Sequence, residues 1–426
     1  MSKTKNDEAW EKLFEIYKII PAIQREGSFE ISATQINKLR EARLMTKFDH
    51  RANLPKVFSD NKLSILPITR GSYVISPFEA YQELKDINAG ISKVPFPEYL
   101  QSIDYDNISS ESTAINCAFV SGIIADFVQD QNLLPTVSGR MSSNSFSFSI
   151  RNTATGKGMP VNVVNSQIEI DGGYEGYDYL TLIEAKNSIS DDFLIRQLYY
   201  PYRLWSGKVL KQVKPIFMVY TNGIYSLYEY VFEDINNYNS LLLVKQKNYS
   251  IETVDINLGE LLQVFERVQL VSEPEIPFPQ ADSFRRVINL CELLYQNNMT
   301  RDEITTNYDF DPRQTNYYTD AARYLGLVDK QKEKGSVAYV LTSEGERIFQ
   351  LKYKARQLKF VELIAKHKPF YDTLRRCFTI GKIPAKDEIV DIMKKSQLYR
   401  VESESTFRRR ASTIAGWLKW IMDLQR

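Results

Sequence analysis

The stretch at residues 168–187, IEIDGGYEGYDYLTLIEAKN, contains two strand-like runs that each end in charged side chains. Alternate residues of a strand share one face of a sheet, so Glu184 and Lys186 are expected to point the same way. If the two runs pair as a hairpin through GGYEGYDY, Asp171 and Glu184 converge at one end of the sheet. The pattern therefore predicts two carboxylates and an ammonium group side by side.

Such a group of side chains has a specific chemistry. Two carboxylates a few ångströms apart are suitable ligands for Mg²⁺, with water and a substrate phosphate completing an octahedron. Lys186 would stand beside the ion and help to polarise or deprotonate the attacking water, whose pKa the metal lowers. The carbonyl of Ala185 is a candidate for a further ligand. The sequence thus predicts a Mg²⁺-dependent site for phosphodiester hydrolysis, with Asp171 and Glu184 as metal ligands.

The segments around this stretch follow a definite order. Apolar periodicity predicts a helix, three strands, a second helix and a further strand. Small residues such as Ala114, Cys117 and Ala118 would let the first helix lie close against a sheet. The predicted segments are residues 110–130, 146–152, 164–171, 180–187, 190–205 and 214–222.

This pattern resembles the PD-(D/E)xK nuclease superfamily, whose core has the same order of elements. The resemblance covers residues 111–221 and places a catalytic domain at residues 101–271. It implies that Asp171 is the metal-binding acid, Glu184 the second acid and Lys186 the catalytic lysine. Members often add an acid from the first helix and a glutamine from the second. Here the suitably placed residues, which complete the predicted catalytic set, are Glu111 and Gln197.

Some features of this sequence complicate the resemblance. The residue before the predicted acid is Ile170, where the family pattern has proline. Glu169, Glu175 and Asp178 lie close enough in sequence that one of them could replace or assist that acid. An ordinary surface hairpin carrying Asp, Glu and Lys is the alternative, because a Glu-x-Lys triplet by itself is weak evidence. A second such triplet, residues 83–85, occurs in a pattern typical of a helix.

Residues 1–100 are predicted to form an α+β domain that contacts DNA. Helical periodicity is present in EAWEKLFEIYKII and again after Ser32, and LSILPITRGSYVIS is typical of a strand pair that turns at Arg70 and Gly71. Basic side chains surround the second apolar stripe. The candidates for DNA contact are Arg40, Arg43, Lys47 and Arg51. A plain α+β cap without DNA contact fits the same pattern equally well.

A proline-rich segment, residues 272–283, is typical of an interdomain linker. Residues 284–350 then have the order of a winged helix-turn-helix domain, with three helices followed by two strands that turn near Gly335. Asp311 and Pro312 suit the start of the third helix. That helix would present four side chains to bases or phosphates, namely Arg313, Gln314, Asn316 and Tyr317.

Residues 351–426 are predicted to form a basic, helix-turn-helix-like domain. They contain 18 Lys and Arg against 8 Asp and Glu, a balance of +10 in a chain whose net charge is +1. The final helix carries Arg408, Arg409 and Arg410 in its first turns, which suits docking in a major groove. A solvated, lysine-rich helical surface is the alternative.

The numbers and positions of the cysteine and histidine residues argue against several other classes of site. The three cysteines are isolated in sequence, and the only histidines are His50 and His367. This disfavours disulfide frameworks, zinc sites and nucleases that use histidine-rich metal sites. The N-terminus carries no apolar leader and no run reaches the length of a membrane span, so a cytoplasmic location and no membrane partner are expected.

The expected fold class is therefore a multidomain α+β and α/β protein, with a mixed-sheet nuclease core and C-terminal winged helix-turn-helix domains. The architecture looks like that of the large type II restriction endonucleases. That likeness implies cleavage of double-stranded DNA at a short sequence and a cognate DNA methyltransferase as genetic partner. A symmetric target implies a homodimer. The alternatives are a repair or mobile-element nuclease, and a DNA-binding regulator with an inactive nuclease-like core.

Overall fold

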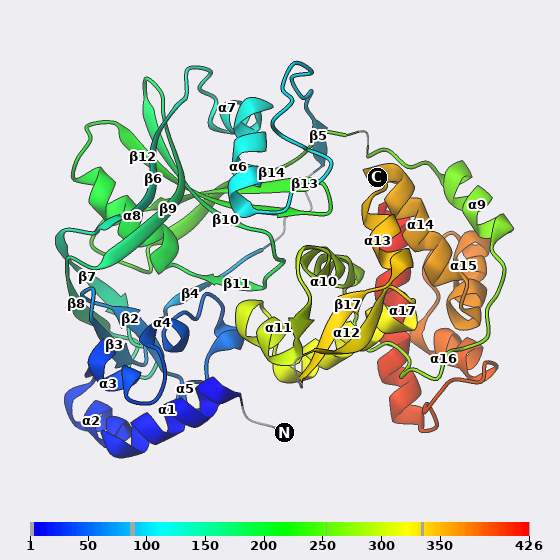
Figure 1. The fold of residues 1–426 in the computed structure, drawn as a ribbon, viewed down its shortest axis with the longest axis horizontal. Helices are drawn as coiled ribbons and strands as arrows, with labels where there is room; N and C mark the ends of the chain where they lie inside the picture. The colour runs from blue at the N-terminus through cyan, green and yellow to red at the C-terminus, as the bar shows by residue number, and fades with distance from the viewer. Residues whose placement is uncertain (1–3, 86–89, 253, 334–335, 426) are drawn as a thin grey trace. The chain divides into compact units, whose positions relative to one another are not determined.

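The computed structural model describes residues 4–85, 90–252, 254–333 and 336–425 of the chain. These residues form an α+β protein of two compact units (Figure 1). The first unit contains the described residues up to Ile91 together with 110–220 and 225–249, and the second contains 92–109, 221–224 and the chain from residue 250. The N-terminal region and the predicted catalytic segment thus belong to one unit.

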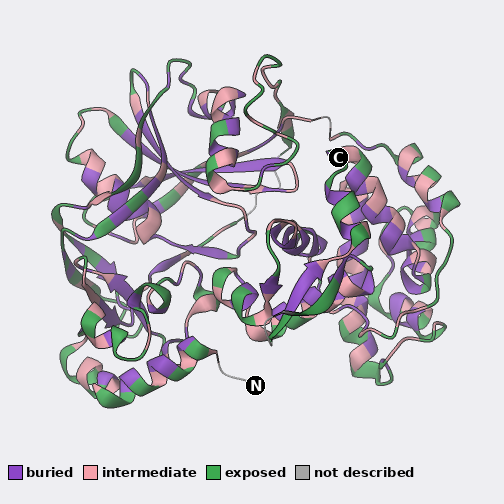
Figure 2. Ribbon diagram, in the orientation of Figure 1, coloured by how far each residue is buried: buried purple, intermediate pink, exposed green. Residues whose placement is uncertain are grey.

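The first unit is built on a central sheet. Its strands are β5 (Ile91–Lys93), β6 (Leu134–Ser142), β9 (Gln167–Glu175), β10 (Tyr179–Lys186), β12 (Gln212–Thr221), β13 (Ile224–Phe232) and β14 (Leu241–Ser250). Among the described residues the strand order is β5-β14-β13-β12-β10-β9-β6. β6, β9 and β10 are antiparallel neighbours, whereas β10 and β12 run parallel. The central strands are buried along most of their length (Figure 2).

Helices connect and cover these strands; they are α6 (Glu111–Val120), α7 (Ile123–Val128) and α8 (Arg196–Ser206). α6 packs Ile115 against Gly172 of β9, which pairs with Ile183 of β10. α8 packs Tyr202 into a cluster with Leu182, the neighbour of Ile183. Because successive residues of a strand point to opposite faces, α6 and α8 cover opposite faces of the sheet. α8 is also the crossover that the parallel pairing of β10 and β12 requires.

Both predicted helices of this segment are shorter than expected. Gly122, with φ +78°, breaks the helix predicted at residues 110–130 into α6 and α7. The helix expected from residue 190 begins instead at Arg196, because β11 (Asp192–Leu194) pairs with β4 (Tyr81–Glu83). The second Glu-x-Lys triplet therefore begins in a strand, and its expected helix was wrong.

The strand predicted at residues 146–152 does not belong to the central sheet. It is β7 (Ser145–Arg151), which pairs with β8 (Gly158–Val164) in a separate two-stranded sheet. β6 takes the expected place beside β9, and the sequence analysis missed it because its residues are mostly exposed and lack an apolar alternation. The expected turn was also misplaced, since residues 172–175 continue β9.

The N-terminal region packs around one indole ring. The ring of Trp10 contacts that of Phe58 with 4.8 Å between centroids, and its Nε1 donates to the carbonyl of Met45 at 2.8 Å. The predicted hairpin that turns at Arg70 and Gly71 is confirmed. The elements are α1 (Lys5–Ile16), α2 (Ile19–Glu26), β1 (Phe29–Ser32), α3 (Ala33–Asn37), α4 (Ala42–Met45), η1 (Arg51–Asn53), α5 (Lys56–Asp60), β2 (Ser64–Pro67) and β3 (Ser72–Ser76).

The second unit is mainly helical, with a small sheet of order β15-β17-β16. Asp311 caps α12 with Pro312 at the first helical position, as predicted, and Ser403 caps α17. The expected turn at Gly335 lies outside the described residues. The elements are α9 (Leu258–Arg267), α10 (Phe284–Gln296), β15 (Met299–Thr300), α11 (Arg301–Asn307), α12 (Pro312–Tyr324), β16 (Val328–Glu333), β17 (Ser336–Leu341), α13 (Ser343–Phe349), α14 (Tyr353–Ala365), α15 (Lys368–Ile380), α16 (Lys386–Lys394) and α17 (Glu404–Asp423).

One continuous hydrophobic core runs through this second unit, from Ile256 to Ile421. The proline-rich segment at residues 272–283 is part of it, since Phe278 and Ala281 are buried. Trp417 of α17 donates from Nε1 to the carbonyl of Ala281 at 2.6 Å. The segment therefore packs as a structural element, which differs from the linker that its composition suggested.

His367, which precedes α15, makes the stability of this unit depend on pH. Its ring is buried and stacks on Tyr324, with 4.1 Å between ring centroids. Burial, with a further contribution from Lys366, lowers the pKa of His367 from 6.5 to about 4. Glu273 Oε1 lies 3.8 Å from Nδ1, beyond hydrogen-bond distance, and does not offset this.

The unfolded chain takes up a proton near the ordinary pKa of 6.5 that the folded chain binds only near pH 4. The free energy of unfolding is therefore highest above this ordinary pKa, and it decreases as the pH falls toward the pKa of the folded protein. We expect the free energy of unfolding to drop by about 2 kcal/mol between about pH 7.5 and about pH 5. His367→Phe should remove this part of the pH dependence in unfolding experiments, and an identical pH profile for both proteins would contradict it.

Candidate active site

A cleft of about 600 Å³ in the first unit brings together the residues predicted to be catalytic. Its lining includes all five of them: Glu111, Asp171, Glu184, Lys186 and Gln197. They come from the start of α6, from β9, from the end of β10 and from the start of α8. Residues that are far apart in sequence thus meet beside β9 and β10, two interior strands of the central sheet.

The pairing of β9 with β10 places the two acids next to each other. The register runs from Leu180 opposite Glu175 to Ile183 opposite Gly172, so the next positions are Asp171 and Glu184. The backbone pairing of the two strands ends before these positions. Beyond it, the backbone N–H of Ala185 donates to the side-chain oxygen Oδ2 of Asp171 at 2.9 Å. This bond fixes the orientation of the Asp171 carboxylate at the cleft.

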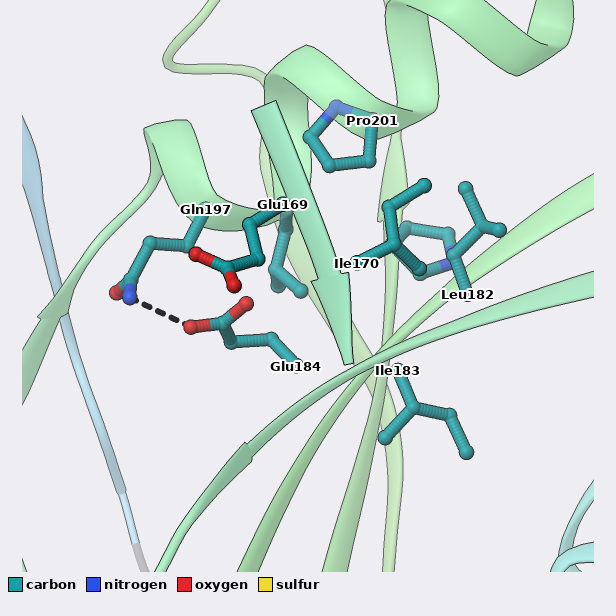
Figure 3. Close-up of a pocket in the computed structure, with 9 residues that line it drawn as sticks. Glu169, Ile170, Leu182, Ile183, Glu184, Gln197 and Pro201 are labelled. Atoms are coloured by element: carbon teal, nitrogen blue, oxygen red, sulfur yellow. Dashed lines mark hydrogen bonds between the residues drawn. The ribbon is translucent and has the colours of Figure 1, made fainter. Parts of the chain in front are cut away.

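Glu184 is the centre of a hydrogen-bond network. Its Oε1 accepts from Lys186 Nζ at 2.6 Å and from Gln197 Nε2 at 2.6 Å. Figure 3 shows Gln197 reaching from α8 to the Glu184 carboxylate, with Glu169 beside them. Both members of the Glu184–Lys186 pair are largely buried, with 10% and 12% of their side chains exposed. The charges of the site are therefore poorly screened by solvent.

Burial and the neighbouring charges together shift the pKa values of this pair. Burial raises the pKa of Glu184 to about 8, and the nearby charges of Asp171 and Asp49 act in the same direction, against the opposing effect of Lys186. Burial alone would lower the pKa of Lys186, but the carboxylates of Glu184, Asp49, Glu111 and Asp171 outweigh it and raise that pKa. Lys186 is consequently an ammonium group near neutral pH.

The other two predicted acids share this environment. Burial raises the pKa of Asp171 above its ordinary value, against the bond from Ala185 and the charge of Lys186. Burial also raises the pKa of Glu111, to which the charge of Asp171 adds. A cleft that destabilises several negative charges at once is one in which a cation would be favoured.

The donor set fits Mg²⁺. Asp171 Oδ2 and Glu184 Oε1 accept from nitrogen donors, and the second oxygen of each carboxylate, Asp171 Oδ1 and Glu184 Oε2, is the candidate metal ligand. Gln197 Oε1 is buried and has no hydrogen-bond partner among the described residues. Mg²⁺ commonly takes one or two carboxylates and fills its remaining positions with water and phosphate oxygens.

The three acids considered as substitutes for Asp171 lie in different places. Glu169 lines the cleft and pairs with Arg140 at 3.2 Å. Glu175, at the far end of β9, pairs with Lys211 at 2.6 Å, and Asp178 is exposed in the turn. Glu169 is therefore the only one of these three that the structure brings to the cleft.

Several residues of the cleft were not predicted from the sequence. Asp49 lies with its Oδ2 4.0 Å from Lys186 Nζ, although 137 positions separate them in sequence. Arg70, Arg140 and Arg196 also line the cleft and give it a cationic rim. No local pattern marks these residues, because they come from turns and from separate elements.

The predicted DNA-contacting residues of the N-terminal region divide into two pairs. Arg43 and Lys47 are exposed and line the cleft. Arg40 is half-buried and does not line it, while Arg51 interacts with Asp192, at 3.8 Å between Nε and Oδ2. Arg43 and Lys47 thus remain the stronger candidates for contact with a polyanion.

In the second unit, α12 carries the four residues predicted to contact DNA. Some of them are exposed to solvent, and one takes part in the cap of the helix. Arg313 and Asn316 are exposed, and Tyr317 is half-buried. Gln314 completes the capping box of the helix, since its Oε1 accepts from the backbone N–H of Asp311 at 3.0 Å. The side-chain oxygen of Gln314 is therefore engaged in the capping box, which disfavours a base contact by this residue.

The three arginines of α17 also differ from one another. Arg408 is bound to Asp387 at 2.7 Å and to Glu404 at 3.5 Å. Arg409 is exposed. Burial lowers the pKa of Arg410, whose Nε has no hydrogen-bond partner among the described residues. Arg408 and Arg409 are thus both exposed, and Arg408 is held by acidic side chains.

Comparison with known proteins gives three family matches, each to a domain of unknown function. DUF6996 matches residues 7–75, DUF6997 matches residues 76–250 and DUF7226 matches residues 286–426. No curated protein and no solved structure matches the chain. Asp171, Glu184 and Lys186 fall within the DUF6997 match, whereas Asp49 falls within the DUF6996 match. In the part of the chain that is described, no helix is long and apolar enough to cross a membrane.

Proposed function

We propose that this protein is a Mg²⁺-dependent nuclease that hydrolyses phosphodiester bonds of double-stranded DNA. The observation that carries the proposal is the meeting of Asp171, Glu184 and Lys186 in one cleft, with Gln197 bonded to Glu184 at 2.6 Å. An incidental group of surface charges would be solvated, whereas these side chains are buried and joined by hydrogen bonds.

The order of elements supports the same proposal. α6, β6, β9, β10, α8 and β12 follow one another around the site, apart from α7, the inserted β7–β8 hairpin and β11. The three antiparallel strands, together with β12 parallel to β10, make a mixed sheet, which is what a core of the PD-(D/E)xK kind would need. The proposal is therefore supported by the order of these elements as well as by the motif.

Each side chain has a definite task in the proposed reaction. Asp171 and Glu184 would hold Mg²⁺, which when bound lowers the pKa of water and offsets charge on the phosphate. Lys186, as an ammonium group, would donate to the attacking water or to a phosphate oxygen and orient it. Gln197 holds the Glu184 carboxylate, and Glu111 supplies a further acid at the edge of the cleft.

The second unit favours DNA as the substrate. Its order of α10, β15, α11, α12, β16 and β17 accords with a winged helix-turn-helix, and the exposed Arg313 and Asn316 of α12 are able to contact phosphates or bases. Our specific proposal is a type II restriction endonuclease with a cognate DNA methyltransferase. Cleavage of both strands at a symmetric target would require a homodimer, because one such site cuts one strand.

Incubation with unmethylated phage DNA tests the proposal. We expect discrete fragments with Mg²⁺ and none with a chelator, because the carboxylate ligands alone cannot activate water. Lys186→Ala should reduce the cleavage rate by at least about 10²-fold. Lys85→Ala is a matched control, since Lys85 is the exposed lysine of the other Glu-x-Lys triplet.

The outcomes separate the competing functions. Equal cleavage by Lys186→Ala would show that the assigned site is wrong. A DNA mobility shift by both proteins without cleavage would favour a DNA-binding regulator. A preference for strand ends or branched DNA over plasmid sites would favour a repair or mobile-element nuclease.

A further inference from the structure

Lys186 has a second carboxylate neighbour from the N-terminal region. Its Nζ lies 2.6 Å from Glu184 Oε1 and 4.0 Å from Asp49 Oδ2. Only 16% of the Asp49 side chain is exposed, so its charge acts on Lys186 with little screening by water. Asp49 also lies 3.9 Å from Lys47, but that lysine is 75% exposed and the interaction is correspondingly weak.

The backbone beside Asp49 is fastened to the strand that leads into α8. The N–H of Leu194 donates to the carbonyl of Asp49 at 2.9 Å. His50 Nδ1 donates to the carbonyl of Asp192 at 2.7 Å, and the N–H of Arg51 donates to Asp192 Oδ1 at 3.0 Å. Three consecutive residues are therefore bonded to β11.

A further contact comes from the partner strand of β11. Tyr81 of β4 donates from its hydroxyl to the carbonyl of Phe48 at 2.9 Å, and this bond is buried. The segment from Phe48 to Arg51 is thus bonded to both strands of the β4–β11 sheet. Such anchoring fixes the position of the Asp49 side chain far more firmly than a surface loop would.

We propose that Asp49 is a positioning residue of the active site, which holds the Lys186 ammonium group in place for the reaction. The inference rests on the proposed nuclease function. When Glu184 shares its charge with a metal ion, its attraction for Lys186 weakens, and Asp49 is the carboxylate that keeps Nζ directed into the cleft. The site then needs residues from both the DUF6996 and the DUF6997 matches.

This assignment changes the role of the N-terminal region. The sequence alone suggests a separate DNA-contacting domain or a cap, but Asp49 makes the region part of the catalytic cleft. Arg43, Lys47 and Arg70 line the same cleft. A phosphodiester substrate would therefore lie between the N-terminal region and the residues of β9 and β10 that line the cleft.

Kinetics of Asp49→Asn test the proposal. We expect kcat to fall about 10- to 100-fold with little change in KM, because the lysine loses its orientation while the substrate-binding surface remains. Asp49→Glu should restore part of the loss. Glu41→Gln is the matched control, since Glu41 is exposed in the same segment and its side chain does not cap α4.

A second readout does not depend on nuclease activity. The rate at which an amine-directed acylating reagent modifies Lys186, followed by peptide mass spectrometry, should rise several-fold in Asp49→Asn and stay unchanged in Glu41→Gln. If the wild-type protein does not cut DNA, the proposed function fails, while the labelling still tests the Asp49–Lys186 pair. Cleavage by wild type with an unchanged kcat in Asp49→Asn, or a lower kcat without faster labelling, would overturn the inference alone.

Discussion

Replacing Glu184 with glutamine is expected to lower Mg²⁺-dependent DNA cleavage by about 10²- to 10³-fold while leaving the protein folded. The amide keeps the size of the side chain and an oxygen that can accept from Gln197 and Lys186, which bond to Glu184 at 2.6 Å each. It removes the negative charge that Mg²⁺ requires of its ligand. Single-turnover cleavage of DNA measures the loss.

Thermal unfolding separates loss of metal binding from other causes. Mg²⁺ at about 100 times its Kd should stabilise the wild-type protein by about 2.7 kcal/mol, and Glu184→Gln should lose this effect. Glu83→Gln is the control, because Glu83 is the exposed acid of the second Glu-x-Lys triplet. A Glu184→Gln protein that is still stabilised by Mg²⁺ and still cuts DNA would exclude Glu184 as a ligand.

Local patterns were sufficient to predict which residues meet at the core of the candidate site. Asp171, Glu184 and Lys186 lie on two strands adjacent in sequence, so the period of a strand and a short connection determine where they meet. Ile168 and Ile170 are buried and Glu169 between them is exposed, which is the alternation typical of a strand. The caps of α12 and α17 were likewise predictable, because Asp311 and Ser403 act on backbone groups within one turn.

Features that depend on distant contacts were not predictable from these patterns. Asp49 reaches Lys186 through bonds to β11, which itself exists as a strand by pairing with β4. β6 is mostly exposed, so no hydrophobic alternation marks it. Residues 272–283 have the composition of a linker, and their burial depends on α17, which lies more than a hundred positions later.

The stretch that identified the site also contains an unusual packing requirement, at Gly173 of β9. A Cβ atom at this position would lie 2.7 Å from both the Cβ and the carbonyl oxygen of Val137 in β6. The carbonyl oxygen belongs to the backbone of β6, which is paired with β9. It therefore cannot move away by a side-chain rotation. The sequence analysis assigned this glycine to a turn, whereas its role is to let two strands approach.

We therefore expect Gly173→Val to destabilise the first unit by about 3 kcal/mol or more, because β6 and β9 must separate to admit the side chain. Gly172→Ala should cost less, since its Cβ would meet the side chains of Ile115 at 3.1 Å and Tyr174 at 3.2 Å, which are able to shift. Gly71→Ala is the control, with no atom within 4 Å of the added carbon. Urea unfolding followed by circular dichroism ranks the three variants.

The same substitution should affect the site beyond its effect on folding. Asp171 is two residues from Gly173 on β9, and its carboxylate is held by the N–H of Ala185 at 2.9 Å. A displaced β9 would break this bond and move one of the two proposed metal ligands. Gly173→Val should thus lose Mg²⁺-dependent cleavage even under conditions in which it remains folded. If Gly173→Val has the stability and the cleavage rate of the wild type, the prediction is wrong. In that case β6 moves to admit the side chain without displacing β9, and β10 alone determines the position of Asp171.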